Sequence, residues 1–122
     1  MTRTASDPQA HLPLTASMFH ILLALADEER HGYGMLLEIE QRTRGELRMG
    51  TGTMYSAIRR LRSKGLILEA DERPAPEQDD ARRIYYRLTD LGHEVLTAEA
   101  VRLDELVAQA RGKRLLPAGR GG

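Results

Sequence analysis

One basic stretch of the chain carries residue types that can bind nucleic acid. Residues 51–65, TGTMYSAIRRLRSKG, combine hydroxyl side chains, a tyrosine and several arginines. Hydroxyl groups and tyrosine can hold phosphate oxygens, and an arginine can donate two hydrogen bonds to guanine. The stretch therefore has the chemistry to contact both the backbone and the bases of DNA. The alternative is a solvated basic helix that binds nothing, and the rest of the chain must decide between these interpretations.

The apolar residues of this stretch have helical spacing. Met54, Ile58 and Leu61 fall at i, i+4 and i+7, so they share one face of a helix. Ser56 and Arg59 point the opposite way. A short helix with an apolar back and a front of hydroxyls and arginines suits the major groove of DNA.

Length and composition indicate a single soluble domain. The chain has 122 residues, of which 41% are hydrophobic and 30% are charged, and these values are typical of a globular protein. It has no cysteine, which excludes disulfides, thiolate metal sites and cysteine nucleophiles. The N-terminus is polar and no apolar run approaches membrane-spanning length, so we expect neither a signal peptide nor a transmembrane helix. The sequence therefore predicts a cytoplasmic protein without a membrane partner.

Positive charge is concentrated around the basic stretch, although the formal net charge of the whole chain is zero. Residues 44–64 contain six basic residues and one acidic residue, a local net charge of +5, whereas residues 27–40 have a local net charge of −4. Phosphate binding depends on such a local cluster rather than on the total charge. The charge distribution therefore favours a nucleic-acid contact at the basic stretch.

Two segments that precede the basic stretch would position it. Thr15 is a suitable N-cap for a first helix that continues to Leu25 and has apolar residues on several sides. A second helix is expected from Tyr33 to about Thr43, and a short link then leads into the basic stretch. Two short helices joined by a brief glycine-containing turn, with the second helix basic, form the helix-turn-helix arrangement.

A predicted β-hairpin follows the basic helix, which we expect to end at Gly65. Residues 66–70 and 84–88 have the composition of strands. The segment between them, residues 71–81, is polar, contains two prolines and is too long for a tight hairpin. This pattern is typical of the wing of a winged helix, and because its tip is acidic we expect its base, and not its tip, to touch DNA. Arg82 and Arg83 stand at the base of this wing and Arg73 on its loop, and these are the wing arginines predicted to contact DNA.

The last predicted helix has an apolar face that a small domain cannot cover alone. We expect it to begin after the N-cap Thr89 and to run to roughly Lys113. A second copy of the chain is the simplest cover, which predicts a homodimer. The alternative is a helix folded back onto its own wing and first helix. The predicted dimerisation residues are Leu96, Leu103, Leu106, Val107 and Ala110, and Glu99 interrupts this seam.

These elements predict a mainly α fold with a small β-hairpin, which is a winged helix-turn-helix plus a long C-terminal dimerisation helix. The expected parts are a disordered N-terminal arm at residues 1–13 and a winged helix-turn-helix DNA-binding domain at residues 14–88. The dimerisation helix follows at residues 89–113, and residues 114–122 are expected to form a disordered tail.

Three segments of the chain form a recognisable combination. They read HGYGM at residues 31–35, GTMYSAIRRL at residues 52–61 continuing to KGLI at residues 64–67, and RRIYYRLTDLG at residues 82–92. Together they resemble the PadR family of winged-helix transcriptional regulators, over roughly residues 14–110. A short chain with a single helix after the wing is similar to the smaller subgroup of that family, and the resemblance implies dimerisation through that helix.

The resemblance also implies a set of DNA-contacting positions. It places Thr53, Tyr55 and Arg59 on the recognition helix and Tyr33 at the start of the second helix, near the DNA backbone. Ser56 lies on the same helix, where many members have proline. Because the chain has no tryptophan, the tryptophan-flanked drug site of some small-subgroup members cannot be carried over. The predicted DNA-binding residues are Tyr33, Thr51, Thr53, Tyr55, Ser56, Arg59, Arg60, Arg73, Arg82 and Arg83.

The sequence gives no support to a catalytic or metal site. The four histidines lie at no metal-ligand spacing. Residues 50–55, GTGTMY, begin like a dinucleotide-binding loop but lack its third glycine and a preceding strand. Asp79 and Asp80 lie in a proline-containing loop that offers no dry pocket for paired catalytic carboxylates. We therefore expect no enzyme, no metal and no cofactor.

Taken together, these patterns favour a homodimeric DNA-binding repressor. Its recognition helices would enter adjacent major grooves of a pseudo-palindromic operator in double-stranded DNA, about 34 Å apart. A small apolar or aromatic effector, bound between the first and last helices, would shift the dimer to a spacing that DNA does not fit. The alternative is a winged-helix protein–protein interaction module without operator reading, which would dock through the acidic residues Glu28, Glu29, Glu38 and Glu40.

Overall fold

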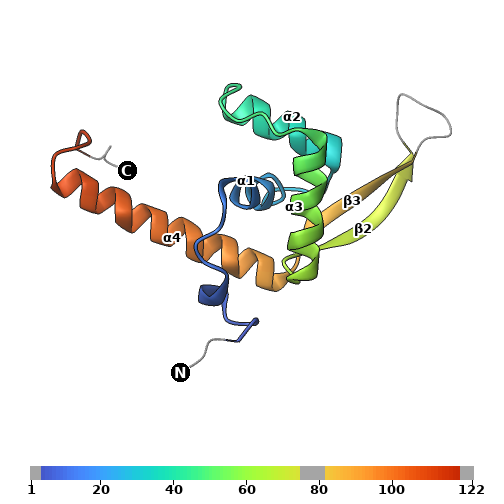
Figure 1. Ribbon diagram of the computed structural model, residues 1–122, viewed down its shortest axis with the longest axis horizontal. Coiled ribbons are helices and arrows are strands. Elements are labelled where there is room, and N and C mark those ends of the chain that lie inside the picture. The colour runs from blue at the N-terminus through green and yellow to red at the C-terminus, as the bar shows by residue number, and fades with distance from the viewer. Residues whose placement is uncertain (1–3, 75–81, 119–122) are drawn as a thin grey trace.

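The computed structural model describes residues 4–74 and 82–118, with the side chains of residues 72–74 and 82 left out (Figure 1). Its described part is mainly helical with a small antiparallel sheet, which confirms the predicted fold class. In chain order the elements are the 3-10 helix η1 (Pro8–His11), α1 (Ala16–Ala24), β1 (Arg30–His31), α2 (Gly32–Arg42), α3 (Thr51–Ser63), β2 (Ile67–Pro74), β3 (Arg82–Leu88) and α4 (Asp90–Gly112).

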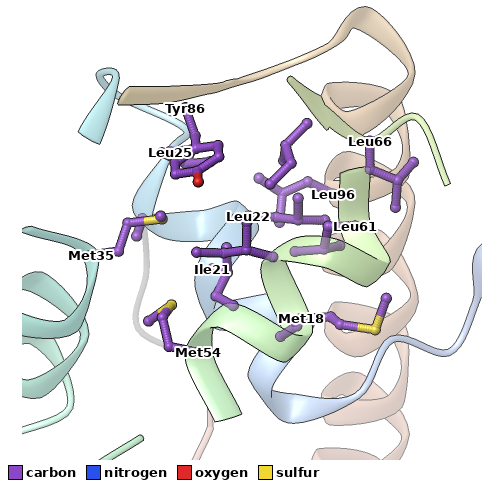
Figure 2. Close-up of a cluster of buried hydrophobic side chains, with 14 of the residues drawn as sticks. Met18, Ile21, Leu22, Leu25, Met35, Met54, Leu61, Leu66, Tyr86 and Leu96 are labelled. Carbon is purple, nitrogen blue, oxygen red and sulfur yellow. The ribbon is translucent and has the colours of Figure 1, made fainter. Parts of the chain in front are cut away.

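Helix α1 lies at the centre of the core. Its predicted N-cap is confirmed, because the Thr15 hydroxyl accepts the Met18 backbone N–H at 3.1 Å. Ile21 and Leu22 are fully buried, and Figure 2 shows side chains from α3, α4 and the sheet converging on them. Burying each such side chain contributes about 1.5–3 kcal/mol. The helix is therefore the support against which the other elements pack.

The predicted inner face of α3 is confirmed. Met54, Ile58 and Leu61 are all at most 1% exposed. Gly65 ends the helix with φ +75°, and its own N–H donates to the Arg62 carbonyl. The next N–H, from Leu66, donates to the Leu61 carbonyl, and the two bonds together form a Schellman cap. Because the second bond ties Leu66 to α3, this cap fixes the point at which the wing begins.

Helix α2 packs against α1, α3 and the sheet. Met35 and Ile39 are buried, whereas Leu37 is 42% exposed. The helix packs along a narrow stripe, because its buried core residues Met35 and Ile39 are one turn apart on the same face. The link from α2 to α3 is anchored by Leu47 and Met49, which pack against the core.

The sheet is larger than the predicted hairpin. Strand β2 continues to Pro74 and β3 begins at Arg82, so residues 71–74 pair with the next strand rather than belonging to the loop. The remaining expected loop, residues 75–81, lies outside the described residues. The third strand, β1, pairs with β3 through Arg30↔Tyr86 and His31↔Tyr85. A two-residue strand has no periodicity, so sequence reasoning missed it.

The N-terminal arm is another difference from expectation. Of the predicted disordered segment, residues 4–13 are described, and Pro8–His11 forms η1 against α4. The arm is held where it enters α1, because the Leu14 N–H donates to the Glu99 carboxylate at 2.8 Å. Glu99 is 2% exposed and also accepts a hydrogen bond from Arg102. A buried carboxylate with two donors is the physical reason that the arm has a fixed place.

Helix α4 is half inside and half outside the fold. Thr89 caps it by accepting the Gly92 N–H at 2.9 Å, as predicted. Gly92 permits the close crossing of the wing, since a Cβ there would lie 1.9 Å from the Leu66 carbonyl oxygen. Leu96, expected in the dimer seam, is 7% exposed and belongs to the core of its own chain. Beyond Glu99 the helix extends past the other elements (Figure 1).

Within the described residues, none of the helices combines the length and the apolar character needed to cross a bilayer. Nor do these residues include a group of three or more histidine, aspartate or glutamate side chains that could hold a metal ion.

Candidate nucleic-acid interface

The outer face of α3 presents the polar residues of the basic stretch to solvent. Its inner face is buried, so the orientation of the helix is fixed by the core. Arg62 forms an ion pair with Glu69 at 3.0 Å. Among the described residues, no acidic side chain forms an ion pair with Arg59 or Arg60, so both charges remain available to a partner. The predicted residues exposed on this helix are Thr51, Thr53, Tyr55, Ser56, Arg59 and Arg60.

A groove of about 260 Å³ lies on the wing side of α3, and we call it the tyrosine groove. Tyr33 and Tyr55 flank it and are 55% and 40% exposed. The guanidinium carbon of Arg83 lies 5.9 Å from the centre of the Tyr33 ring, a cation–π contact. The structure therefore brings three of the predicted residues together, from α2, α3 and β3. The groove is lined by His31, Gly32, Tyr33, Tyr55, Arg83, Ile84 and Tyr86.

His31 contacts both the start of α2 and the wing strand β3 in this groove, although sequence reasoning gave it no role in DNA binding. Its Nδ1 accepts the Gly34 N–H at 3.0 Å and so caps α2, and its Nε2 lies 2.9 Å from Nη1 of Arg83. A neutral imidazole has one acceptor nitrogen, so only one of these donors can be bonded at a time. The ring also meets Tyr85 edge-on at 5.1 Å. His31 thus links the start of α2 to the base of the wing.

Gly32 explains how Tyr55 approaches α2 so closely. A Cβ at position 32 would lie 2.6 Å from the Tyr55 hydroxyl oxygen. Any residue other than glycine would therefore displace the Tyr55 side chain. Glycines on both sides of Tyr33 are the signal in the sequence for a close backbone approach at this helix start.

A second groove, of about 400 Å³, lies on the other side of α3, between this helix and the start of α1. We call it the hydroxyl groove. Thr15 and Ser17 contribute to it from α1, and neither was among the predicted site residues. Only the tertiary fold brings them beside α3, so no local pattern could have identified them. The polar side chains that line this groove are Thr15, Ser17, Thr53, Ser56 and Arg60.

Arg59 occupies the crest between the two grooves. At 100° per residue, it lies between Tyr55 on the wing side and Ser56 on the other side. All three side chains are exposed. The helix therefore presents a central arginine with a polar groove along each flank.

The remaining predicted wing residues lie on paired strand positions. In the register of the sheet, Arg73 is opposite Arg83 and Pro74 is opposite Arg82. The side chains of Arg73 and Arg82 lie outside the described part of the structure, so among these three predicted arginines only the side chain of Arg83 is placed.

A third surface lies away from α3. An apolar groove of about 430 Å³ runs between α1 and α4 and is lined by residues that include Phe19, Leu23 and Val101. Farther along α4, the predicted dimerisation residues Leu103 and Leu106 are exposed. Val107 is also exposed and Ala110 is half-buried, so one face of α4 beyond Glu99 is apolar and is not covered by other described residues of the chain.

Several titratable side chains have a pKa shifted by their surroundings, and Glu99 and His20 are two of them. The hydrogen bond from Arg102 holds the pKa of Glu99 below its ordinary value, although burial acts in the opposite direction. Burial lowers the pKa of His20, and the nearby positive charge of Arg42 lowers it further. Neither group belongs to the outer face of α3. Glu99 bonds to Leu14, just before α1, and His20 contacts Arg42 of α2.

Known proteins resemble this chain in both sequence and fold. Residues 21–98 match the model of the transcriptional regulator PadR-like family. The transcriptional regulator Rv3488 of Mycobacterium tuberculosis is 34% identical over 106 residues, which cover 87% of this chain and 92% of the relative.

Two solved structures place the fold in the same group. A PadR family transcription regulator from Clostridium difficile R20291 has a TM-score of 0.63 at 27% identity, covering 80% of this chain and 97% of that one. Bacillus subtilis PadR, crystallised with operator DNA, has a TM-score of 0.57 at 20% identity, covering 69% of this chain and 46% of that one. At the lower identity the likeness concerns the fold alone.

Proposed function

The chain belongs to the PadR-like family of transcriptional regulators, and we propose that it is a homodimeric repressor that binds operator DNA and is released by a small-molecule effector. The observation that carries this proposal is the outer face of α3. It presents Arg59 and Arg60 without an intrachain ion pair among the described residues, on a helix held rigidly by its buried face. The Bacillus subtilis protein of the same fold was crystallised with operator DNA, which supports the proposed partner.

In this proposal α3 enters the major groove, and its crest reads the bases. Arg59 donates two hydrogen bonds to a guanine, a contact that discriminates against the wrong base by about 1–3 kcal/mol. On the wing side, Tyr33, Tyr55 and Arg83 hold the DNA backbone. These contacts position the helix but carry no sequence information of their own.

The dimer is formed by the part of α4 that extends beyond the chain's own core. Leu103, Leu106 and Val107 are exposed there, and a second copy would remove their apolar surface from water. Two copies related by a two-fold axis would set the recognition helices about 34 Å apart, which matches one turn of DNA. The operator is then pseudo-palindromic.

The effector occupies the apolar groove between α1 and α4. Phe19, Leu23 and Val101 offer it an apolar lining, so a small apolar or aromatic molecule fits the chemistry of the site. Because this groove touches the helix that forms the dimer, an occupant can favour a different spacing of the two α3 helices. Thermal-shift screening with such compounds tests this step, and a silent screen would leave DNA binding without an effector.

The alternative of a protein-interaction module has less support. It needs free acidic side chains, yet Glu38 pairs with Arg42 at 2.5 Å and Glu28 pairs with Arg30 at 3.1 Å. Glu40 lies 3.7 Å from Arg48. Internal pairing reduces the negative potential of this face.

A footprinting experiment on the DNA upstream of the protein's own gene tests the proposed function. We expect a protected, pseudo-palindromic fragment. The logarithm of the association constant should fall linearly with the logarithm of the salt concentration. Absence of protection, or binding that is insensitive to salt, would contradict the proposal.

A further inference from the structure

We propose that the hydroxyl groove between α1 and α3 holds a phosphate of the DNA backbone, on the side of the recognition helix opposite the wing. This inference rests on the proposed DNA-binding function and adds a contact that neither the sequence analysis nor the family assignment supplies. It gives Thr15 and Ser17, at the start of α1, a role in binding.

The chemistry of the groove suits a phosphate. Arg60 supplies one positive charge, and the hydroxyls of Ser17, Thr53 and Ser56 can donate hydrogen bonds to phosphate oxygens. Among the described residues, none of these three hydroxyls has a hydrogen-bond partner within the chain. The side chains that line the groove include no carboxylate. An anion would therefore meet donors and no repelling charge.

The Thr15 hydroxyl already accepts one hydrogen bond within the chain and can still donate one to a phosphate. Its oxygen accepts the Met18 N–H, and its proton is then free to be donated outward. The same cap fixes the position of the α1 start, so the groove has a defined shape before any ligand binds.

The position of the groove identifies the phosphate as one from DNA. The crest residue Arg59 separates the hydroxyl groove from the tyrosine groove. A helix in the major groove lies between the two strands, so its two flanks face the two phosphate backbones. The tyrosine groove then faces one strand and the hydroxyl groove faces the other.

Three variants test the groove: Arg60→Gln, Ser17→Ala and Ser17→Asp. The last adds a negative charge inside the groove, yet Asp is favoured in the first turn of a helix, so α1 should not lose stability. Gln109→Asp and Arg111→Gln, exposed near the far end of α4, are the matched charge controls. Thermal melting of every variant checks that the fold is retained.

Fluorescence anisotropy with a random-sequence duplex and with the footprinted fragment measures the effect. We expect Arg60→Gln and Ser17→Asp to weaken binding to both DNAs roughly tenfold, and Ser17→Ala roughly threefold. Arg60→Gln should also reduce the slope of log affinity against log salt by about 0.9, because one counterion fewer is released. Ser17→Ala should leave that slope unchanged, and the controls should bind like the wild-type chain.

Arg59→Ala, measured in parallel, separates the two proposals. If Arg59→Ala weakens the footprinted fragment while the groove variants bind like wild type, the groove proposal is overturned and the DNA-binding function stands. If no variant, including Arg59→Ala, changes binding to either DNA, the function itself fails.

Neutral methylphosphonate linkages in the footprinted fragment locate the contact. The phosphate whose neutralisation weakens wild-type binding on the groove side should no longer matter in Arg60→Gln, because both changes remove the same contact. Full additivity of Arg60→Gln with every neutralised phosphate would overturn the assignment.

Discussion

Helices α3 and α4 each have a buried and an exposed face, but the two exposed faces differ in chemistry. The exposed face of α3 carries hydroxyls and arginines, whereas one face of α4 beyond Glu99 exposes Leu103, Leu106 and Val107. A polar face that stays hydrated suits a charged partner such as DNA, and an apolar one suits a dry contact between proteins. One short chain can therefore offer separate surfaces to two partners, and a change in one surface should spare the other.

The largest expected effect comes from breaking the α4 surface. Leu106 is 46% exposed and lies beyond the core of its own chain, so Leu106→Asp should leave the fold intact and dissociate the dimer. Affinity for the footprinted fragment should then fall roughly 10²–10⁴-fold, since the two half-site contacts are no longer linked. Sedimentation velocity and anisotropy measure the two effects.

The control for this variant is Gln109→Asp, which adds the same charge on a neighbouring exposed turn. It should remain dimeric and bind DNA normally. A Leu106→Asp protein that stays dimeric at micromolar concentration would show that the exposed part of α4 is not the interface.

The inner face of α3 gives the next largest effect. Leu61→Ala should lower the free energy of unfolding by about 2–5 kcal/mol, because Leu61 is fully buried and its removal leaves a cavity. Tyr55→Ala, six residues earlier on the exposed side, should change it by much less. Chemical denaturation at fixed protein concentration measures both, and similar losses would mean that the two faces of α3 are not distinct.

A smaller and more selective effect is expected at the crest of α3. Arg59→Ala should weaken binding to the footprinted fragment by about 1–3 kcal/mol and binding to random duplex by less, if it reads guanine. Arg83→Ala, on the wing side, should weaken both DNAs alike, since a backbone contact carries no sequence information. Anisotropy titrations at one salt concentration make the comparison, and equal losses on both DNAs in both variants would reject this division of roles.

Much of this comparison followed from sequence, because helix faces and caps are local. The spacing of Met54, Ile58 and Leu61 predicted the buried face of α3, and Thr15 and Thr89 were predicted as N-caps. The order of helix, link, helix and strands was enough to predict a winged helix.

The rest depended on contacts between distant parts of the chain. Ser17 meets α3 only because the core fixes α1 against it. Glu99, read from its spacing as an interruption of an apolar seam, is a buried carboxylate that bonds Leu14, which is 85 residues away in sequence. Such a partner has no local signature, so the fixed position of the N-terminal arm could not be predicted.

Glu99 also marks where α4 changes from buried to exposed, and its titration gives the smallest predicted effect. Its folded pKa lies below the ordinary value of 4.5 because of Arg102. The carboxylate therefore stabilises the fold fully above about pH 4.5, and this contribution is lost as the pH falls through the folded pKa. Glu99→Gln should cost about 1–3 kcal/mol at neutral pH, as a buried hydrogen bond to a charged group is weakened.

Denaturation at several pH values measures the free energy of unfolding of the wild-type chain and of Glu99→Gln. The two curves of this free energy against pH should converge on acidification. The wild-type chain and Glu99→Gln should differ by a constant amount above pH 4.5, and the difference should shrink on acidification, because protonated Glu99 resembles the amide. Asp104→Asn, an exposed change one turn farther along α4, should give a smaller difference at neutral pH. If Glu99→Gln matched the wild-type stability at pH 7, the arm would not be held by this carboxylate, and the boundary between the buried and exposed halves of α4 would need another cause.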